Sequence, residues 1–158
     1  MANYVQYYEP AALKAKELCE NAKTDREKYD AVTKWLNRAV VYDYVRATKA
    51  KDLTGPDIAR CFELKLGICM DIASLAVAMF RAVGLKANVV FGWATLTYTV
   101  QPARGGLHAY TRAPAWHAWA EVYLEGKKLD YDQMVEQRNL NRTRDKYTAT
   151  YRACAVHK

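Results

Sequence analysis

The sequence predicts an α+β domain in which helices come first along the chain and antiparallel strands follow. Helical patterns, with apolar residues three or four apart, occupy the chain up to Val83. After Gly84 the apolar residues alternate with polar ones or form short runs between turn signals, as they do in strands. Helices that precede the strands, instead of alternating with them, indicate an α+β domain and not a parallel sheet.

Size and composition fit one folded domain over residues 1–158. Hydrophobic residues make up 51% of the chain and charged residues 26%, which is ordinary for a globular protein. A chain of 158 residues can bury a core without help from a metal or disulfides. We therefore expect a single domain that is a monomer.

Two helices are expected in the first 40 residues. The first begins near Glu9, with proline at its first turn, and runs to about Asn21. Residues 24–27, Thr-Asp-Arg-Glu, form a capping box that opens the second helix. Its apolar positions are Tyr29, Val32, Leu36 and Ala39. Residues 40–44 leave this helix, and the Gly-Pro-Asp at 55–57 starts a short helix or a turn.

A buried helix and then the strands are expected in the rest of the chain. The helix runs from Cys69 to Val83, and Gly84 ends it in a left-handed conformation. Residues 102–114 form a loop or an irregular hairpin, and Glu125-Gly126 is a hairpin turn. The expected strands are 85–93, 95–100, 116–124, 127–134 and 147–156.

The net charge of +7 favours an anionic partner such as a nucleic acid, a membrane surface or an acidic cell-wall polymer. Basic residues are spread along the chain and thicken near its end. The residues of that segment are Arg138, Arg142, Arg144, Lys146 and Arg152. No zinc-finger, homeodomain or RNA-binding aromatic pattern accompanies them, so we expect no nucleic acid partner.

The printed sequence shows neither an export signal nor a membrane span. Its first ten residues lack a basic region and an apolar region. No apolar run approaches the length of a span. The chain as the mature or excised part of an exported protein stays an open alternative.

Of the four cysteines, Cys19, Cys61, Cys69 and Cys154, only Cys69 has the setting of a nucleophile. There is no CxxC pair, so no metal site is expected. Cys69 opens the buried helix, where unpaired N–H groups and the helix dipole favour the thiolate, the reactive form of cysteine. Its own backbone N–H is placed to bind an oxyanion after attack. The small Gly67 is expected to let the substrate backbone come close.

His117 is the expected base and Asp132 the residue that orients it. If the Glu-Gly pair forms a two-residue turn, Asp132 lies diagonally across the hairpin from His117 on the same face. Diagonal neighbours are about 7–8 Å apart, within reach of an aspartate that holds an imidazole. Asp130 lies one step farther along that face. The alternatives are a core histidine with one hydrogen bond and exposed strand aspartates.

These residues resemble the transglutaminase-like superfamily, especially its bacterial members. The resemblance covers about residues 29–134. It implies a papain-like core in which the cysteine helix packs on an antiparallel sheet, with Cys69 as nucleophile, His117 as base and acid, and Asp132 as orienter. The family often has an Asp-Pro-Thr-like stretch at the acid, which this chain lacks, so Asp130 stays an alternative. The blocks that carry the resemblance are Gly-Ile-Cys-Met-Asp-Ile-Ala-Ser-Leu at 67–75, Met-Phe-Arg-Ala-Val-Gly-Leu-Lys-Ala at 79–87, Val-Phe-Gly at 90–92, His-Ala-Trp-Ala-Glu-Val-Tyr at 117–123, and Asp132.

The combined interpretation is a cysteine enzyme that cleaves peptide or isopeptide amides through an acyl-enzyme. Hydrolysis is favoured, because nothing in the sequence indicates a site that keeps water out and admits an amine. The alternatives are transamidation of protein glutamine and a non-catalytic binding module on the same fold. We expect a peptide or protein substrate, with cell-wall material as one candidate, and no cofactor.

Two further groups of residues are weaker candidates. The long segment 95–115 lies next to the expected site in sequence, and long loops often shape a substrate cleft. Its candidates for substrate contact are Tyr98, Arg104, Tyr110 and Arg112. Tyr42 and Tyr44 are candidates for the second oxyanion donor.

Overall fold

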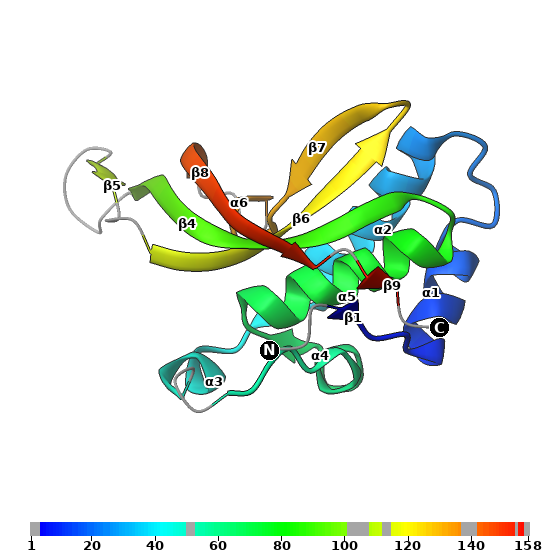
Figure 1. Cartoon of the computed structure of the whole chain (residues 1–158), viewed down its shortest axis with the longest axis horizontal. Coiled ribbons are helices and arrows are strands. Elements are labelled where there is room, and N and C mark those ends of the chain that lie inside the picture. Colours follow the sequence, from blue (N-terminus) through cyan, green and yellow to red (C-terminus); the bar gives the residue numbers. More distant parts are fainter. Residues whose placement is uncertain are drawn as a thin grey trace.

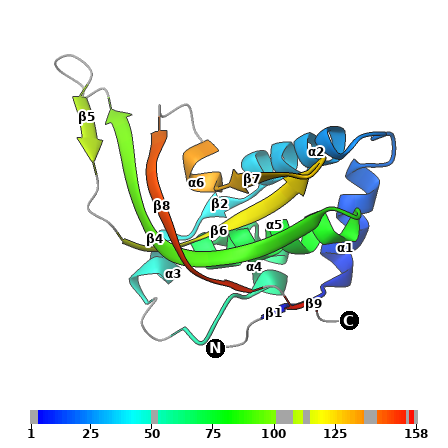
Figure 2. The same ribbon diagram turned by 45° about the horizontal axis from the view of Figure 1, so that its top comes forward.

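The structure, a computed structural model, describes residues 4–49, 53–100, 108–111, 115–136, 142–153 and 155–156, with the side chains of 5–49, 53–94 and 116–134. A layer of helices lies against one face of a curved antiparallel sheet (Figures 1 and 2). This arrangement confirms the α+β class that the sequence predicts.

The helices are α1 (Glu9–Leu18), α2 (Asp25–Ala39), α3 (Tyr44–Thr48), α4 (Ile58–Leu64), α5 (Cys69–Ala82) and α6 (Gln133–Glu136). The strands are β1 (Tyr4–Val5), β2 (Val41–Tyr42), β3 (Leu66–Gly67), β4 (Lys86–Val100), β5 (His108–Thr111), β6 (Ala115–Leu124), β7 (Lys127–Tyr131), β8 (Arg142–Ala153) and β9 (Ala155–Val156). The prediction from sequence missed α3, α6 and the short strands β1, β2 and β3, and it extended the first helix three residues too far.

Side-chain oxygens start three of the helices. Thr24 accepts a hydrogen bond from the N–H of Glu27 at 3.1 Å, which confirms the cap at the start of α2. The Glu27 carboxylate accepts from the N–H of Lys23 and not, as a capping box requires, from that of Thr24. Asp43 and Asp57 cap α3 and α4 in the same way.

The long strand β4 organises the sheet. It pairs with β6 over residues 86–94, with β5 over 97–100 and with β8 over 89–98, always antiparallel. Two strands were expected in its place. Register shifts toward β8 near Gly92 and Thr95 interrupt the regular pattern while the strand continues. The β4–β5 pairing supports the hairpin alternative for residues 102–114, of which 102–107 and 112–114 lie outside the described residues. β8 begins at Arg142, before the expected start at residue 147.

The β6–β7 hairpin has the expected two-residue turn. Glu125 and Gly126 both have positive φ, 54° and 79°, as a type I′ turn requires. Leu124 therefore pairs with Lys127, and Ala120 with Tyr131. The strand ends at Tyr131 and not at residue 134 as expected, because Gln133 begins α6.

The core forms around α5. Leu75, Ala76, Val77, Met79 and Phe80 have no exposed surface. Burial of a large apolar side chain stabilises a fold by roughly 1.5–3 kcal/mol. The sheet contributes the side chains of one face, and α1, α2 and α4 cover the other sides of α5. The sheet residues in this core include Val89, Phe91, Ala118, Ala120 and Val122.

Gly67 has a different role from the one expected. A Cβ at this position would lie 2.7 Å from the Sγ of Cys61 and 3.0 Å from the Cβ of Asp71. Gly67 and Cys61 are both buried. The missing side chain therefore makes room for the core beneath the start of α5, and not for a substrate.

Replacement of Gly67 by alanine should destabilise the fold. The added methyl group overpacks a buried site, at a cost of about 1–3 kcal/mol in the free energy of unfolding. Gly55→Ala is the matched control, because a Cβ there meets nothing within 4 Å. Urea unfolding of both variants measures the difference. Equal stability of the two would contradict this account, whereas the Cys61→Ala background should recover part of the loss.

Candidate active site

Cys69 is the first residue of α5 and is half-buried. The buried carboxylate of Asp71 secures this start of the helix. It accepts hydrogen bonds from the N–H groups of Ile68 at 3.0 Å and Asp57 at 2.8 Å. The guanidinium of Arg46 donates to both of its oxygens, at 2.8 and 3.1 Å. Two sequence-distant segments are thereby joined to the turn that carries Cys69.

A second ion pair extends this network. Asp43 accepts from the N–H of Arg46 at 2.9 Å and from the guanidinium of Arg60 at 2.8 Å. These two hydrogen bonds hold the pKa of Asp43 below its ordinary value. Sequence reasoning missed the network. The signal in the sequence that could have indicated it is Asp71, an acid in the first turn of an otherwise apolar helix.

The chain before Cys69 is also joined to the end of α2. β2 and β3 pair in parallel, with Val41 opposite Leu66 and Tyr42 opposite Gly67. The N–H of Val41 donates to the carbonyl of Lys65, and the N–H of Asp43 to that of Gly67, both at 2.9 Å. The segment that follows α2 therefore sets where α5 begins.

The structure brings His117 and Asp132 into direct contact. His117 Nε2 lies 2.6 Å from Asp132 Oδ2, and both residues are buried. An ionised carboxylate only accepts, so Nε2 carries the proton and donates it. The other carboxylate oxygen, Oδ1, accepts from the N–H of Met134 at 3.1 Å. Nδ1 is the ring nitrogen that does not face Asp132.

The electrostatic setting favours a protonated His117. Burial alone lowers the pKa of the imidazole, but the charge and hydrogen bond of Asp132, together with the side chain of Cys69, raise it to about 10. The ring of His117 also stacks on that of Trp119, with centroids 6.3 Å apart. His117 and Asp132 therefore form a buried donor–acceptor pair.

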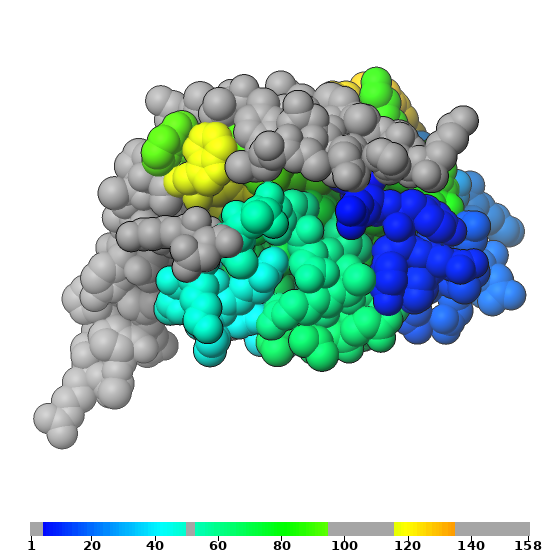
Figure 3. All heavy atoms as spheres, turned by 60° about the horizontal axis from the view of Figure 1, so that its bottom comes forward, coloured from blue at the N-terminus to red at the C-terminus, as the bar shows by residue number. Residues whose placement is uncertain are grey.

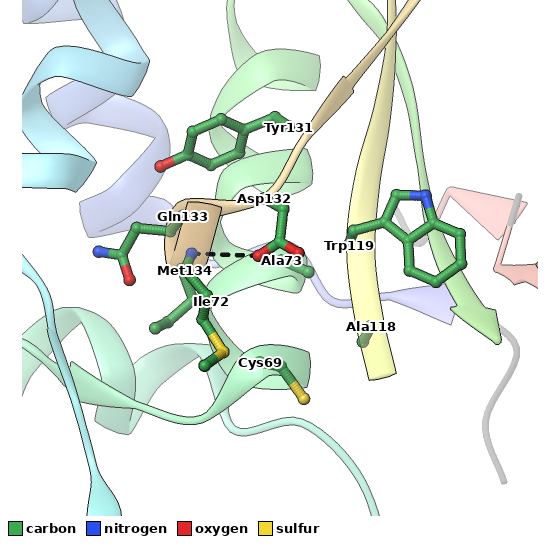
Figure 4. Close-up of a pocket in the computed structure, with 9 residues that line it drawn as sticks. All are labelled: Cys69, Ile72, Ala73, Ala118, Trp119, Tyr131, Asp132, Gln133 and Met134. Atoms are coloured by element: carbon green, nitrogen blue, oxygen red, sulfur yellow. Dashed lines mark hydrogen bonds between the residues drawn. The ribbon is translucent and has the colours of Figure 1, made fainter. Parts of the chain in front are cut away.

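A small pocket lies beside Cys69 and Asp132 (Figure 4). Residues from the first turns of α5, from β6 and from the end of β7 and start of α6 line it. They are Cys69, Ile72, Ala73, Ala118, Trp119, Tyr131, Asp132, Gln133 and Met134. Figure 3 shows the face where the start of β6 (yellow) lies beside the surface from α3 to α5 (cyan to green).

The other described cysteines have buried positions unlike that of Cys69. Cys61 lies inside α4 without exposed surface, and burial raises its pKa to about 12. Burial also raises the pKa of Cys19 at the end of α1. These three cysteines are free thiols, and Cys154 lies outside the described residues. The described part of the chain holds no cluster of side chains suited to a metal ion.

Of the weaker candidates, Tyr42 and Tyr44 have side chains that the structure describes. Tyr42 lies in β2 beside Gly67, and its ring meets that of the exposed Tyr44 edge to face, with centroids 5.0 Å apart. Their proposed role toward an oxyanion stays a prediction. The side chains of Tyr98, Arg104, Tyr110 and Arg112 lie outside those that the structure describes.

Comparisons with known proteins identify the family of the chain. The profile of the transglutaminase-like superfamily matches residues 13–132, most of the chain. The chain belongs to this superfamily. No curated protein sequence matches it.

Within the described ranges, no helix combines the length and apolar character that crossing a bilayer requires.

Three solved structures share the fold. A candidate protease from Parabacteroides distasonis is 15% identical (TM-score 0.54), and 78% of our chain covers 23% of it. A protein described as a TGase is 21% identical (TM-score 0.56; coverage 90% and 34%). A candidate cysteine protease from Cytophaga hutchinsonii is 16% identical (TM-score 0.59; coverage 93% and 53%). The chain therefore spans from about a quarter to about half of these longer chains.

The His117–Asp132 pair should make stability depend on pH. Because the pKa of His117 is raised from 6.5 to about 10 in the folded state, its stabilising effect is complete below about pH 6.5 and lost as the pH approaches about 10. Wild type should therefore exceed Asp132→Asn in free energy of unfolding by a margin that is largest near pH 6 and shrinks toward pH 10. Urea unfolding across this range measures the margin, and one that stays constant would contradict the pairing.

Proposed function

We propose that this chain is a cysteine enzyme that cleaves peptide or isopeptide amides through an acyl-enzyme. Cys69 is the nucleophile, His117 the general base and acid, and Asp132 the residue that orients the imidazole. The observation that carries the proposal is the 2.6 Å contact of His117 Nε2 with Asp132, and the effect of the Cys69 side chain on the pKa of His117 supports it. Membership of the transglutaminase-like superfamily supports it.

The proposed chemistry uses the two ring nitrogens of the imidazole differently. The thiolate of Cys69 attacks the amide carbonyl, a C–S bond forms, and the developing oxyanion lies near the N-terminus of α5, where backbone N–H groups favour negative charge. His117 then gives its Nδ1 proton to the leaving amine as the C–N bond breaks. A water molecule attacks the thioester, His117 takes its proton, and the acid product leaves with the thiolate restored.

Asp132 contributes by geometry and charge. Its Oδ2 holds the ring at Nε2. This leaves Nδ1 to exchange the proton in the proposed mechanism, and the negative charge of Asp132 stabilises the imidazolium. Asp130 has other partners. It lies opposite Glu121 in the hairpin and 3.9 Å from the ammonium of Lys128. These contacts favour Asp132 over Asp130 as orienter.

The substrate is a peptide or protein, with cell-wall material as one candidate, and the acceptor is water. The likeness to a protein described as a TGase motivates the second candidate function, transfer of the acyl group to an amine. Both functions share the acyl-enzyme and differ only in the step that resolves it. That the chain is a single domain and a monomer stays a prediction.

The fate of the acyl group decides between these two functions. With a glutamine-containing peptide and an excess of a primary amine, we expect the hydrolysed product to exceed the amine-linked one, because no described feature of the site excludes water. Mass spectrometry of the products measures the ratio, with Cys69→Ala as the blank. A majority of amine-linked product would replace hydrolysis by transamidation.

The two aspartates should differ in their effect on turnover. Loss of the orienting acid costs about 10⁴-fold in a serine triad, and a thiolate–imidazolium pair depends on it less, so Asp132→Asn should reduce turnover by at least about 10²-fold. Asp130→Asn should change it by less than about tenfold, or 1.4 kcal/mol in the barrier. Both variants are assayed together after circular dichroism shows that each is folded. If Asp130→Asn loses turnover and Asp132→Asn keeps it, the orienting residue is Asp130.

A further inference from the structure

Three consecutive residues, where β7 ends and α6 begins, point to two different sides. Asp132 turns toward His117, whereas its neighbours Tyr131 and Gln133 extend to the opposite side (Figure 4). The Tyr131 hydroxyl donates to the side-chain oxygen of Asn37 at 2.7 Å. The Gln133 amide donates to two main-chain carbonyls at the end of α2, that of Leu36 at 3.0 Å and that of Val40 at 2.8 Å. All of these acceptors lie within residues 36–40.

We propose that Gln133 and Tyr131 are positioning residues that hold Asp132 against His117 by binding the C-terminal end of α2. The proposal rests on the proposed function, because it gives Gln133 and Tyr131 their roles through Asp132. Neither residue is assigned a contact with substrate. Their effect is on where the carboxylate of Asp132 lies.

The chemistry of a glutamine suits this place. The last carbonyls of a helix are short of intrahelical donors, and one side-chain amide supplies two N–H groups. The Leu36 carbonyl also accepts from the N–H of Val40 at 3.1 Å, so Gln133 adds a second donor there. Gln133 is only 3% exposed, so both hydrogen bonds are shielded from water. Within the part of the chain that the structure describes, its own oxygen Oε1 is buried without a hydrogen-bond partner.

That unpaired oxygen argues for a role beyond stability. A buried acceptor without a donor costs free energy, whereas an apolar side chain of the same shape would avoid the cost. Packing alone would therefore favour methionine over glutamine at this position. The two donated hydrogen bonds are what glutamine adds, and they link α6 to α2 across more than 90 residues of sequence.

The end of α2 also sets the position of the nucleophile. β2 follows α2 directly and pairs with β3, two residues before Cys69. The same short segment, residues 36–42, thus borders the chain that leads to Cys69 and the residues on both sides of Asp132. Displacements of about 1 Å in such groups can cost about 10²-fold in rate, so a common support for both has a direct benefit.

The test compares Gln133→Met with a control that weakens α2 at its other end. Thr24→Ala removes the helix cap there and leaves the contacts of residues 131–133 intact. The readout is the pKa of His117, followed by NMR of labelled histidines and assigned with His117→Gln. Asp132 and Cys69 are the titrating groups that face His117. A merely structural role of Gln133 would lower the thermal midpoint without moving this pKa.

We expect Gln133→Met to lower the pKa of His117 by about one unit, because a displaced carboxylate stabilises the imidazolium less. Thr24→Ala should leave it unchanged. Tyr131→Phe keeps the ring packing and should lower the pKa in the same direction, so it carries the test if Gln133→Met does not fold. An unchanged pKa in the folded variants would overturn the proposal.

Failure of this proposal can be told from failure of the proposed function. Iodoacetamide labelling of wild type at neutral pH reports whether Cys69 reacts faster than the buried Cys61. If Cys69 is not the fast thiol, the proposed function fails. If Cys69 is the fast thiol and the pKa of His117 is the same in wild type, Gln133→Met and Tyr131→Phe, only the positioning role fails.

Discussion

The hydrogen bonds made by the last turn of α2 are the constraint on which both halves of the site depend. On one side, the Gln133 amide binds the carbonyls of Leu36 and Val40, next to the residue that contacts His117. On the other side, β2 pairs with β3 and so sets where α5 begins. Because Cys69 and Asp132 are 63 positions apart in sequence, a shared support between them has to be tertiary.

Charge burial is the second constraint on the site. His117 and Asp132 are both shielded from water, and neither would keep its charge there alone. Each stabilises the charged form of the other. At the start of α5, the buried Asp71 is paired with Arg46 in the same way. A buried pair is strongly destabilised by the loss of one partner. Stability and the proposed function at this site therefore rest on the same contacts.

Local rules predicted much of this fold. The type I′ turn at Glu125-Gly126 set the hairpin register, and that register places Asp132 within reach of His117. Long-range contacts were beyond such rules. Nothing local indicates that Gly67 leaves room for Cys61, or that Gln133 binds the end of α2. Periodicity also split β4 into two strands, because register shifts near Gly92 disturb the pattern without ending the strand.

We propose that Cys69 forms an acyl-enzyme, with His117 and Asp132 as the residues that support it. The most direct test is intact-protein mass spectrometry after rapid acid quenching of wild type mixed with a panel of peptides. The account predicts a mass increase equal to the acyl portion of a reactive peptide, mapped to Cys69 and absent in Cys69→Ala. An adduct on another residue, or cleavage that persists in Cys69→Ala, would contradict it.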